Sequence, residues 1–256
     1  MTDWQDFSDV LKDLQFDDAP AGGALVIYQD GEEVVNTAVG QALPGQSWSD
    51  TTLSVNFSIG KGVMATLVAI LVSRALLDYD VPIARYWAQF GVNGKQNITL
   101  RHVLTHTSGL FNITTLTQSL DDLLDWRAMG ELVASMAIDT PRGQEMHGYA
   151  SAYSALVSGW VLGHVVERVT NLSLQEALDE YLAVPLGIQG QLYYGAPSDK
   201  VGQVAKPVRY FDGAPSAKRK PTLKPDTPLM LGTLASLPVS PLWQNALDDT
   251  PIGTAG

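Results

Sequence analysis

The order of apolar and polar residues predicts strands near the N-terminus and helices over most of the remaining chain. Residues 2–16 carry apolar side chains at helical spacing, which is typical of an amphipathic helix. Two β-rich runs follow at 23–29 and 33–39, and Asp30-Gly31 joins them. An Asp-Gly pair between two such runs is the strongest short-range signal for a β-hairpin. We therefore expect an N-terminal helix followed by a hairpin.

Helical patterns then occupy most of the chain as far as residue 190. Residues 58–77 are apolar nearly all round, and a helix of that kind is expected to be buried on all sides. Further helices are predicted over 99–106, 119–136 and 154–170, and from the capping box of Ser173 and Glu176 to the residue before Pro185. After residue 190, glycine, proline and lysine accumulate, which predicts a long surface excursion.

Composition excludes several classes of protein. A chain of 256 residues, with 45% hydrophobic and 17% charged residues, is typical of a globular domain and not of a disordered one. The 16 basic and 27 acidic residues give a net charge of −11, which repels phosphate backbones, so nucleic acid is not an expected partner. The absence of cysteine excludes disulfides, thiolate nucleophiles and cysteine-ligated metals.

The N-terminal residues and the apolar runs bear on where the protein resides. Residues 1–6 include no basic residue and lead into no apolar stretch, so no signal peptide is predicted. The most apolar run, 63–72, is much shorter than the roughly 20 residues that span a bilayer. We therefore expect a cytoplasmic protein with no membrane partner.

The residues with the clearest chemistry lie at 57–62 (FSIGKG), where the apolar helix begins. Positions three apart share one helix face, so the Ser58 hydroxyl and the Lys61 amine can meet. Serine needs an adjacent base to act as a nucleophile, and a lysine in apolar surroundings accepts a proton more readily than one in water. The Ser58 backbone N–H, at a helix N-terminus, can supply half of an oxyanion hole. On these residues alone, a capping serine followed by a solvated lysine is the commoner outcome.

The surrounding sequence favours the catalytic interpretation of Ser58 and Lys61 over the structural one. Recognisable blocks follow one another in a set order: the N-terminal hairpin, then 57–62, 76–87, 98–110, 159–163, 167–170 and 185–187. In this order they resemble the serine β-lactamase-like family, which contains class C β-lactamases, D-alanyl-D-alanine peptidases and S-x-x-K carboxylesterases, and the esterase branch is the most similar. The resemblance implies an α+β fold of the β-lactamase/transpeptidase type, in which helices flank an antiparallel sheet beside a helical subdomain.

The family uses a tyrosine ahead of a helix as a base or proton relay to the serine, and two tyrosines compete for that role. Tyr153 lies at the expected distance before Gly159, whereas Tyr149 better matches the local Y-A-x form. Choosing Tyr149 would insert about one turn into a packed helix, while choosing Tyr153 leaves the extra residues in a loop. We therefore favour Tyr153 and keep Tyr149 as the second choice. The family's asparagine follows neither tyrosine.

The family's third motif, K-T-G or H-x-G, is not found in this chain. Residues 106–109 (HTSG) belong to an earlier block, and 218–220 lack the small residue and the glycine. The predicted strands also amount to one hairpin, which by itself is marginally stable in water. We expect the missing motif and strands to lie beyond Gly256.

The resulting domain organisation has three parts. We expect residues 1–256 to form one β-lactamase-like domain that is incomplete at the C-terminus, as the resemblance implies. The parts within it are a helix and hairpin over about 1–57, a helical subdomain over about 58–190 and a loop-rich segment over about 191–256.

These features predict a serine hydrolase that acts by acyl transfer on short-chain carboxylic esters. Ser58 is the expected nucleophile, Lys61 and Tyr153 move the proton, and the Ser58 amide stabilises the oxyanion. Hydrolysis of amides or β-lactams is one alternative, and an inactive truncated relative is the other. His102 and His106 have the spacing of metal ligands but no third ligand, so we expect structural histidines and no metal or organic cofactor. The expected partner is a small-molecule ester or amide.

Overall fold

The computed structural model describes residues 4–13, 21–113, 116–117, 120–138 and 151–205. These residues fall into two compact units. One lies within 1–55 and 196–217, and the other within 56–195. The candidate residues around Ser58 all belong to the second unit.

The first unit is built on the predicted hairpin. β1 (Gly22–Gln29) pairs antiparallel with β2 (Glu32–Leu43), and the connecting Asp30 and Gly31 have φ of 53° and 86°. Positive φ at both central positions is what a type I′ turn requires, and the twist of that turn matches the twist of the strands. The hairpin prediction is confirmed.

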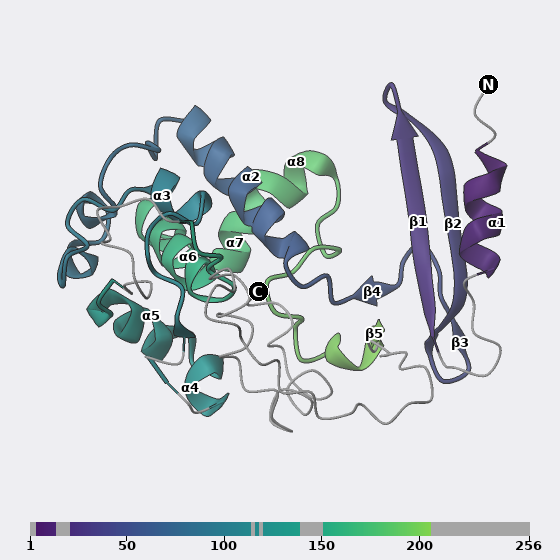
Figure 1. The fold of residues 1–256 in the computed structure, drawn as a ribbon. Helices are drawn as coiled ribbons and strands as arrows, with labels where there is room; N and C mark the ends of the chain where they lie inside the picture. The colour runs from purple at the N-terminus through teal and green to yellow at the C-terminus, as the bar shows by residue number, and fades with distance from the viewer. Residues whose placement is uncertain (1–3, 14–20, 114–115, 118–119, 139–150, 206–256) are drawn as a thin grey trace, which may run out of the picture. The chain divides into compact units, whose positions relative to one another are not determined.

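Short elements complete the first unit. α1 (Gln5–Asp13) lies along the hairpin (Figure 1), and the predicted ends of this helix, residues 2 and 16, lie outside the described residues. Three shorter strands and one 3-10 helix are β3 (Gln46–Ser47), β4 (Leu53–Ser54), β5 (Val204–Ala205) and η5 (Val201–Gln203). β3 extends the hairpin sheet next to β2, and β4 pairs in parallel with β5.

The second unit is helical and holds the large hydrophobic core. Its helices are α2 (Ile59–Ser73), η1 (Ile83–Arg85), η2 (Ala88–Phe90), α3 (Leu100–Leu104), α4 (Leu120–Leu124), α5 (Trp126–Ser135), α6 (Val157–Thr170), α7 (Leu174–Leu178), the π-helix η4 (Asp179–Ala183) and α8 (Val184–Leu186). α6 contacts α2, α3, α5 and α7 (Figure 1) and is buried over most of its length. Within the described part of the chain, no helix has the length and apolarity needed to cross a membrane.

The burial of α2 corrects one expectation. Its buried residues form a single face at spacings of three and four: Met64, Leu67, Val68 and Leu71. Gly62 and Ala69, on other faces, are exposed, so the expectation of burial on all sides is wrong. Glycine and alanine raise the apolar count of a sequence but have little side chain to bury. The helix that is buried nearly all round is α6.

The C-terminus of α2 corrects a second expectation, since the helix ends at Ser73 and not at Leu77. Ala75 has φ of 57°, and its N–H donates to the Val72 carbonyl at 2.9 Å. The Leu76 N–H donates to the Leu71 carbonyl at 3.0 Å. These two bonds form a Schellman motif, which usually has glycine at the left-handed position. Alanine at that position leaves no sequence signal for the helix end.

Two further helices begin or break at side chains that bind backbone groups. The predicted helix over 119–136 is wrong as a single helix, because the Asp125 carboxylate accepts a hydrogen bond from the Ala128 N–H at 2.9 Å and starts α5 there. The helix predicted from Ser154 begins only at Val157. The Ser154 hydroxyl instead donates to the Leu110 carbonyl at 2.6 Å and ties the segment ahead of α6 to the core.

The helical stretch after residue 173 starts as predicted and ends later. The capping box of Ser173 and Glu176 is confirmed. The predicted end before Pro185 is wrong. The helical stretch continues through the π-helix η4 into α8, and it ends at the C-cap Gly187, which has φ of 69°. Pro185 lies at the start of α8, directly after the π-helix η4.

Candidate active site

Ser58 lies at the start of α2, directly after a residue in a strained conformation. Phe57 has φ of 45°, a left-handed value that bulky residues rarely adopt. Ser58 is the N-cap of α2, with φ of −67° and ψ of −4°, and its side chain makes no capping hydrogen bond. Ser58 is also exposed. Its hydroxyl is therefore available for chemistry and does not cap the helix.

The structure brings the three candidate side chains together. The Ser58 Oγ is 2.7 Å from the Tyr153 hydroxyl, and the Lys61 Nζ donates to the same Oγ at 3.3 Å. Nζ also lies 5.3 Å from the centre of the Tyr153 ring, and Lys61 is partly buried. Ser58 and Lys61 share one face of α2, whereas Tyr153 reaches them from the segment ahead of α6. Tyr149 lies outside the described residues.

The backbone N–H groups of the first turn of α2 differ in what they bind. The N–H groups of Ile59, Gly60 and Lys61 each donate to a carbonyl three residues earlier, at 3.1, 3.0 and 3.2 Å. Among the described residues, no group accepts a hydrogen bond from the Ser58 N–H. This N–H lies at the positive end of the helix macrodipole. It is therefore suited to bind a developing negative charge.

Tyr194 supports the same turn from a distant part of the chain. Its hydroxyl donates to the Gly60 carbonyl at 3.0 Å, and burial raises the pKa of its phenol, so that it stays a neutral donor. Sequence reasoning missed Tyr194. No periodic pattern links two residues that are 134 positions apart.

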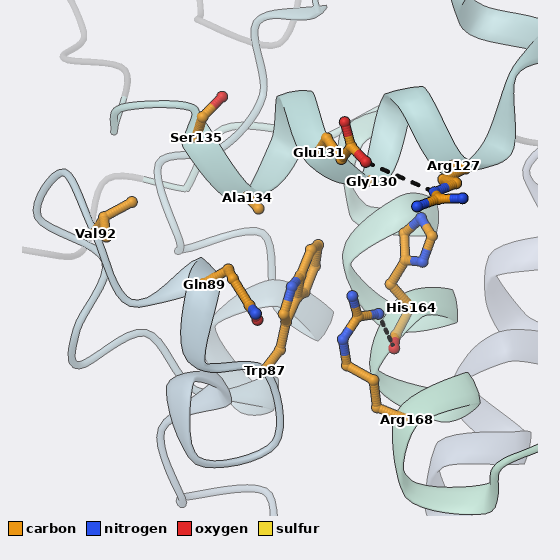
Figure 2. Close-up of a pocket in the computed structure, with 10 residues that line it drawn as sticks. All are labelled: Trp87, Gln89, Val92, Arg127, Gly130, Glu131, Ala134, Ser135, His164 and Arg168. Atoms are coloured by element: carbon orange, nitrogen blue, oxygen red, sulfur yellow. Dashed lines mark hydrogen bonds and ion pairs between the residues drawn. The ribbon is translucent and has the colours of Figure 1, made fainter.

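A separate cavity of about 500 Å³ lies between α5, α6 and η2, and Figure 2 shows its lining. Its charged groups are already engaged. The Arg168 guanidinium lies 4.3 Å from the Trp87 ring centre and donates to the His164 carbonyl, while Arg127 lies 3.7 Å from Glu131. Its one serine, Ser135, donates to the Leu132 carbonyl and has no adjacent amine in the lining. The cavity therefore lacks the hydroxyl–amine pair found at Ser58.

His106 lies beside Tyr153, and sequence reasoning missed this contact. The two ring centres are 4.8 Å apart at an interplanar angle of 67°. The His106 Nδ1 accepts a hydrogen bond from the Ser154 N–H at 3.2 Å. Burial, and then the positive charge of Lys61, lower the pKa of His106. The sequence analysis expected a structural histidine at this position, and no local pattern indicates that it faces the tyrosine.

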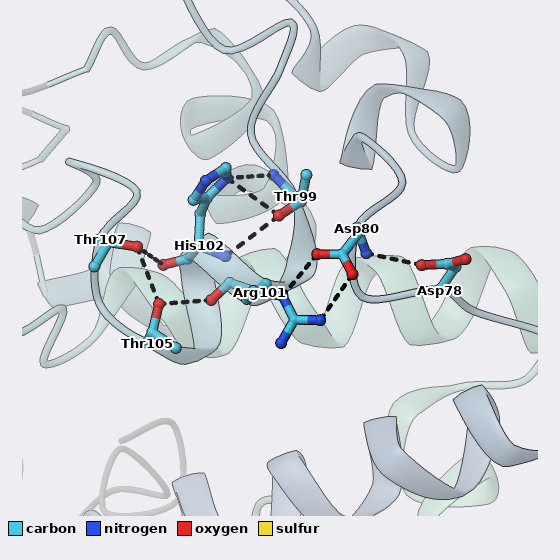
Figure 3. A network of polar contacts seen from close by, with 7 residues as sticks. All are labelled: Asp78, Asp80, Thr99, Arg101, His102, Thr105 and Thr107. Atoms are coloured by element: carbon cyan, nitrogen blue, oxygen red, sulfur yellow. Dashed lines mark hydrogen bonds and ion pairs between the residues drawn. The ribbon is translucent and has the colours of Figure 1, made fainter. Parts of the chain in front are cut away.

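A network of polar contacts surrounds α3 and the turn that follows it (Figure 3). The Arg101 guanidinium binds both carboxylate oxygens of Asp80, at 2.6 and 2.7 Å. Thr99 and His102 form a capping box at the start of α3. The Thr107 N–H donates to the His102 carbonyl at 2.8 Å, which holds the chain in its turn after the helix. His102 and His106 thus have different partners, and no group of three or more potential metal-binding side chains occurs in the described part of the chain.

Comparison with known proteins identifies the family to which the chain belongs. Residues 7–226 match the protein-family model described as Beta-lactamase. The chain therefore belongs to the β-lactamase family, and its fold is of the β-lactamase/transpeptidase type.

Individual relatives are esterases, β-lactamases and penicillin-binding proteins by name. The chain is 36% identical to "Esterase/beta-lactamase LipL" of Mycobacterium tuberculosis, over 77% of this chain and 44% of LipL. It is 29% identical to "Esterase EstB" of Burkholderia gladioli, over 77% of this chain and 52% of EstB. A penicillin-binding protein homologue from Caulobacter crescentus superposes with a TM-score of 0.68 at 29% identity, over 78% of this chain and 53% of that one. The chain spans about half the length of the curated relatives it matches.

Proposed function

We propose that this protein is a serine hydrolase that cleaves carboxylic esters through an acyl-enzyme on Ser58. The observation that carries the proposal is the contact of one hydroxyl with both a phenol and an amine. The Ser58 Oγ lies 2.7 Å from the Tyr153 phenol and 3.3 Å from the Lys61 amine. A serine nucleophile needs a base within about 2.6–3.2 Å, and the distance is often longer when no substrate is bound.

In the proposed acylation step, the Ser58 Oγ attacks the ester carbonyl carbon while its proton passes to the Tyr153–Lys61 pair. The new C–O bond pushes the carbonyl electrons onto oxygen. When the carbonyl re-forms, the ester C–O bond breaks, and the departing alkoxide takes up the proton and leaves as an alcohol. Water then attacks the acyl-enzyme through the same proton transfers. The products are a carboxylic acid and Ser58 with its proton restored.

The proposed oxyanion donor is the Ser58 backbone N–H. Two observations support this assignment. The Ser58 N–H lies at the N-terminus of α2, and no group among the described residues accepts a hydrogen bond from it. A preorganised donor of this kind contributes about 10²–10³ in turnover. Tyr194, through the Gly60 carbonyl, holds the turn in which this N–H lies.

The first test compares hydrolysis of a p-nitrophenyl ester of a short-chain acid by the wild-type chain and by Ser58→Ala. We expect Ser58→Ala to fall to the rate of buffer alone, because the attacking oxygen is gone. Mass spectrometry after a phosphonate ester probe should place the adduct on the peptide that contains Ser58. Equal rates for both proteins would reject the proposal and favour an inactive relative.

The same assay separates the two tyrosines with a matched pair of variants. Tyr153→Phe removes only the hydroxyl that lies 2.7 Å from Ser58 Oγ, and we expect kcat to fall by about 10²–10⁴, as for loss of a general acid–base group. Tyr149→Phe is the control and should keep kcat within a few-fold. The opposite result would assign the proton relay to Tyr149.

β-Lactam hydrolysis is the second candidate function. It is favoured by the relative named "Esterase/beta-lactamase LipL", which is 36% identical to this chain. A chromogenic cephalosporin, assayed beside the ester with the same Ser58→Ala control, distinguishes the two. If kcat/KM is higher for the cephalosporin, the amide-type reaction replaces ester hydrolysis as the function of this site.

A further inference from the structure

We propose that His106 is a positioning residue that holds the Tyr153 phenol against Ser58. This inference rests on the proposed function, because it assigns the part of the fold that places the proton relay. His106 itself forms none of the contacts to Ser58 and is not assigned a role in the bond-making steps.

His106 accepts hydrogen bonds from the residues on both sides of Tyr153. Its carbonyl accepts a hydrogen bond from the Ala152 N–H at 2.9 Å, and its Nδ1 accepts one from the Ser154 N–H at 3.2 Å. Between these two bonds, its ring packs at 67° against the Tyr153 ring, with centres 4.8 Å apart. An edge-to-face contact of this kind restricts the rotation of the phenol. One residue therefore fixes both the backbone and the ring of Tyr153.

His106 can position Tyr153 because its own backbone is held by a hydrogen bond to α3. The His106 N–H donates to the Val103 carbonyl at 3.1 Å, and the residue has φ of 57°. Left-handed backbone of this kind is rare outside glycine, and it turns both the carbonyl and the ring toward the segment ahead of α6. Asparagine also adopts this conformation readily, which makes His106→Asn the natural conservative variant.

The contact with Ser154 determines which nitrogen of His106 carries the proton. Because the Ser154 N–H is a donor, Nδ1 must be the acceptor, and the neutral ring is protonated at Nε2. Adding a proton to Nδ1 would break this bond. It would also place a positive ring beside Lys61 of α2 and against Tyr153, with Arg101 and His102 on the preceding helix α3. The contacts by which His106 positions Tyr153 therefore require a neutral imidazole.

The test compares His106→Ala with His106→Asn in the ester assay. His106→Ala removes both the Nδ1 acceptor and the ring, and we expect kcat to fall roughly 10- to 100-fold with KM changed little. His106→Asn keeps an acceptor for the Ser154 N–H and should recover most of that loss. If His106→Ala has wild-type kcat, or if both variants lose kcat equally, the positioning role is overturned.

Two further readouts distinguish positioning from a general loss of structure. Because burial and Lys61 lower the pKa of His106 from its ordinary value of 6.5, the difference should appear on the acid side of that value: the wild-type kcat should fall more steeply than that of His106→Asn, since only the wild type has the His106 imidazole to protonate. Parallel pH profiles would contradict the proposal. Amide hydrogen exchange at Ser154, whose acceptor is the His106 side chain, should be faster in His106→Ala than in the wild type; Ala152, whose N–H donates to the backbone carbonyl that the variant keeps, is the internal control. This measurement needs no activity, so it tests the contacts of His106 beside Tyr153 even if Ser58→Ala shows that the proposed function fails.

Discussion

At the scale of single residues, Lys95 is the most unusual group in the helical unit outside the candidate site. Its side chain is fully buried, and its Nζ donates to the carbonyls of Val92 and Met136 and lies 5.3 Å from the centre of the Phe90 ring. Burial lowers the pKa of Lys95 from 10.5 to about 8. Carbonyl dipoles and a ring face partly replace the water that a charged amine loses on folding.

This pKa predicts how stability depends on pH. Between pH 8 and about 10.5, the unfolded chain keeps the Lys95 proton that the folded chain releases, so stability rises with pH across this window. The full rise is about 3 kcal/mol. Lys95→Met should lack it, and urea unfolding at pH 7.5 and pH 10 measures the difference. Lys12→Met, at an exposed lysine paired with Asp9, is the control and should follow the wild type. Parallel curves for wild type and Lys95→Met would show that Lys95 does not titrate in this range.

At the scale of elements, the crossing of α5 and α6 depends on two glycines. A methyl group on Gly130 would lie 2.3 Å from the His164 Nε2, and one on Gly163 would lie 2.5 Å from the Trp126 ring. The Trp126 and His164 rings stack with centres 4.4 Å apart between the two helices. Glycine is unfavourable in a helix interior, but here it makes room for this ring pair.

A pair of glycine-to-alanine variants tests this explanation of the crossing. Gly130→Ala should destabilise the protein by about 1–3 kcal/mol, because the added methyl group overpacks a buried contact. Gly62→Ala is the matched control in α2, where no atom beyond the helix's own backbone and the adjacent residues lies within 4 Å of the added group. Alanine is the better helix former, so Gly62→Ala should stabilise by about 0.5–1 kcal/mol. Thermal unfolding of both variants gives the comparison, and stabilisation by Gly130→Ala would reject the packing argument.

At the scale of the whole molecule, the net charge of −11 acts on substrates before they reach Ser58. A negative surface lowers the local concentration of anionic substrates and leaves neutral ones unaffected, and salt screens this effect over about 10 Å at 0.1 M. The proposed neutral esters suit such a surface better than carboxylate-bearing substrates do.

Salt dependence should reveal this preference. For two nitrophenyl esters of equal chain length, one neutral and one ending in a carboxylate, we expect kcat/KM of the anionic ester to rise a few-fold between about 0.01 and 0.15 M salt. The neutral ester is the internal control and should change little. If kcat/KM of the anionic ester instead falls with salt, a local positive field, with Lys61 as its obvious source, outweighs the surface charge.

The sequence by itself determined those features whose parts lie within one element. The Asp30-Gly31 turn fixes the hairpin, the capping box of Ser173 and Glu176 starts α7, and an i,i+3 spacing places Ser58 and Lys61 on one face of α2. Their geometry follows from backbone conformations a few residues long, so local spacing is sufficient to predict them.

Only the tertiary structure decided the contacts between elements. The family resemblance pointed to Tyr153, but no local spacing links it to Ser58, which is 95 positions away. Tyr194 contacts Gly60 from 134 positions away, and His106 contacts Tyr153 from the loop after α3. The burial of only one face of α2 is also a tertiary feature, because it depends on which other elements pack against the helix. Hydrophobic periodicity records how apolar each face of an element is, but not which distant residue will pack against it. The proposed proton relay is therefore a product of packing, built on a serine and a lysine that the sequence had already aligned.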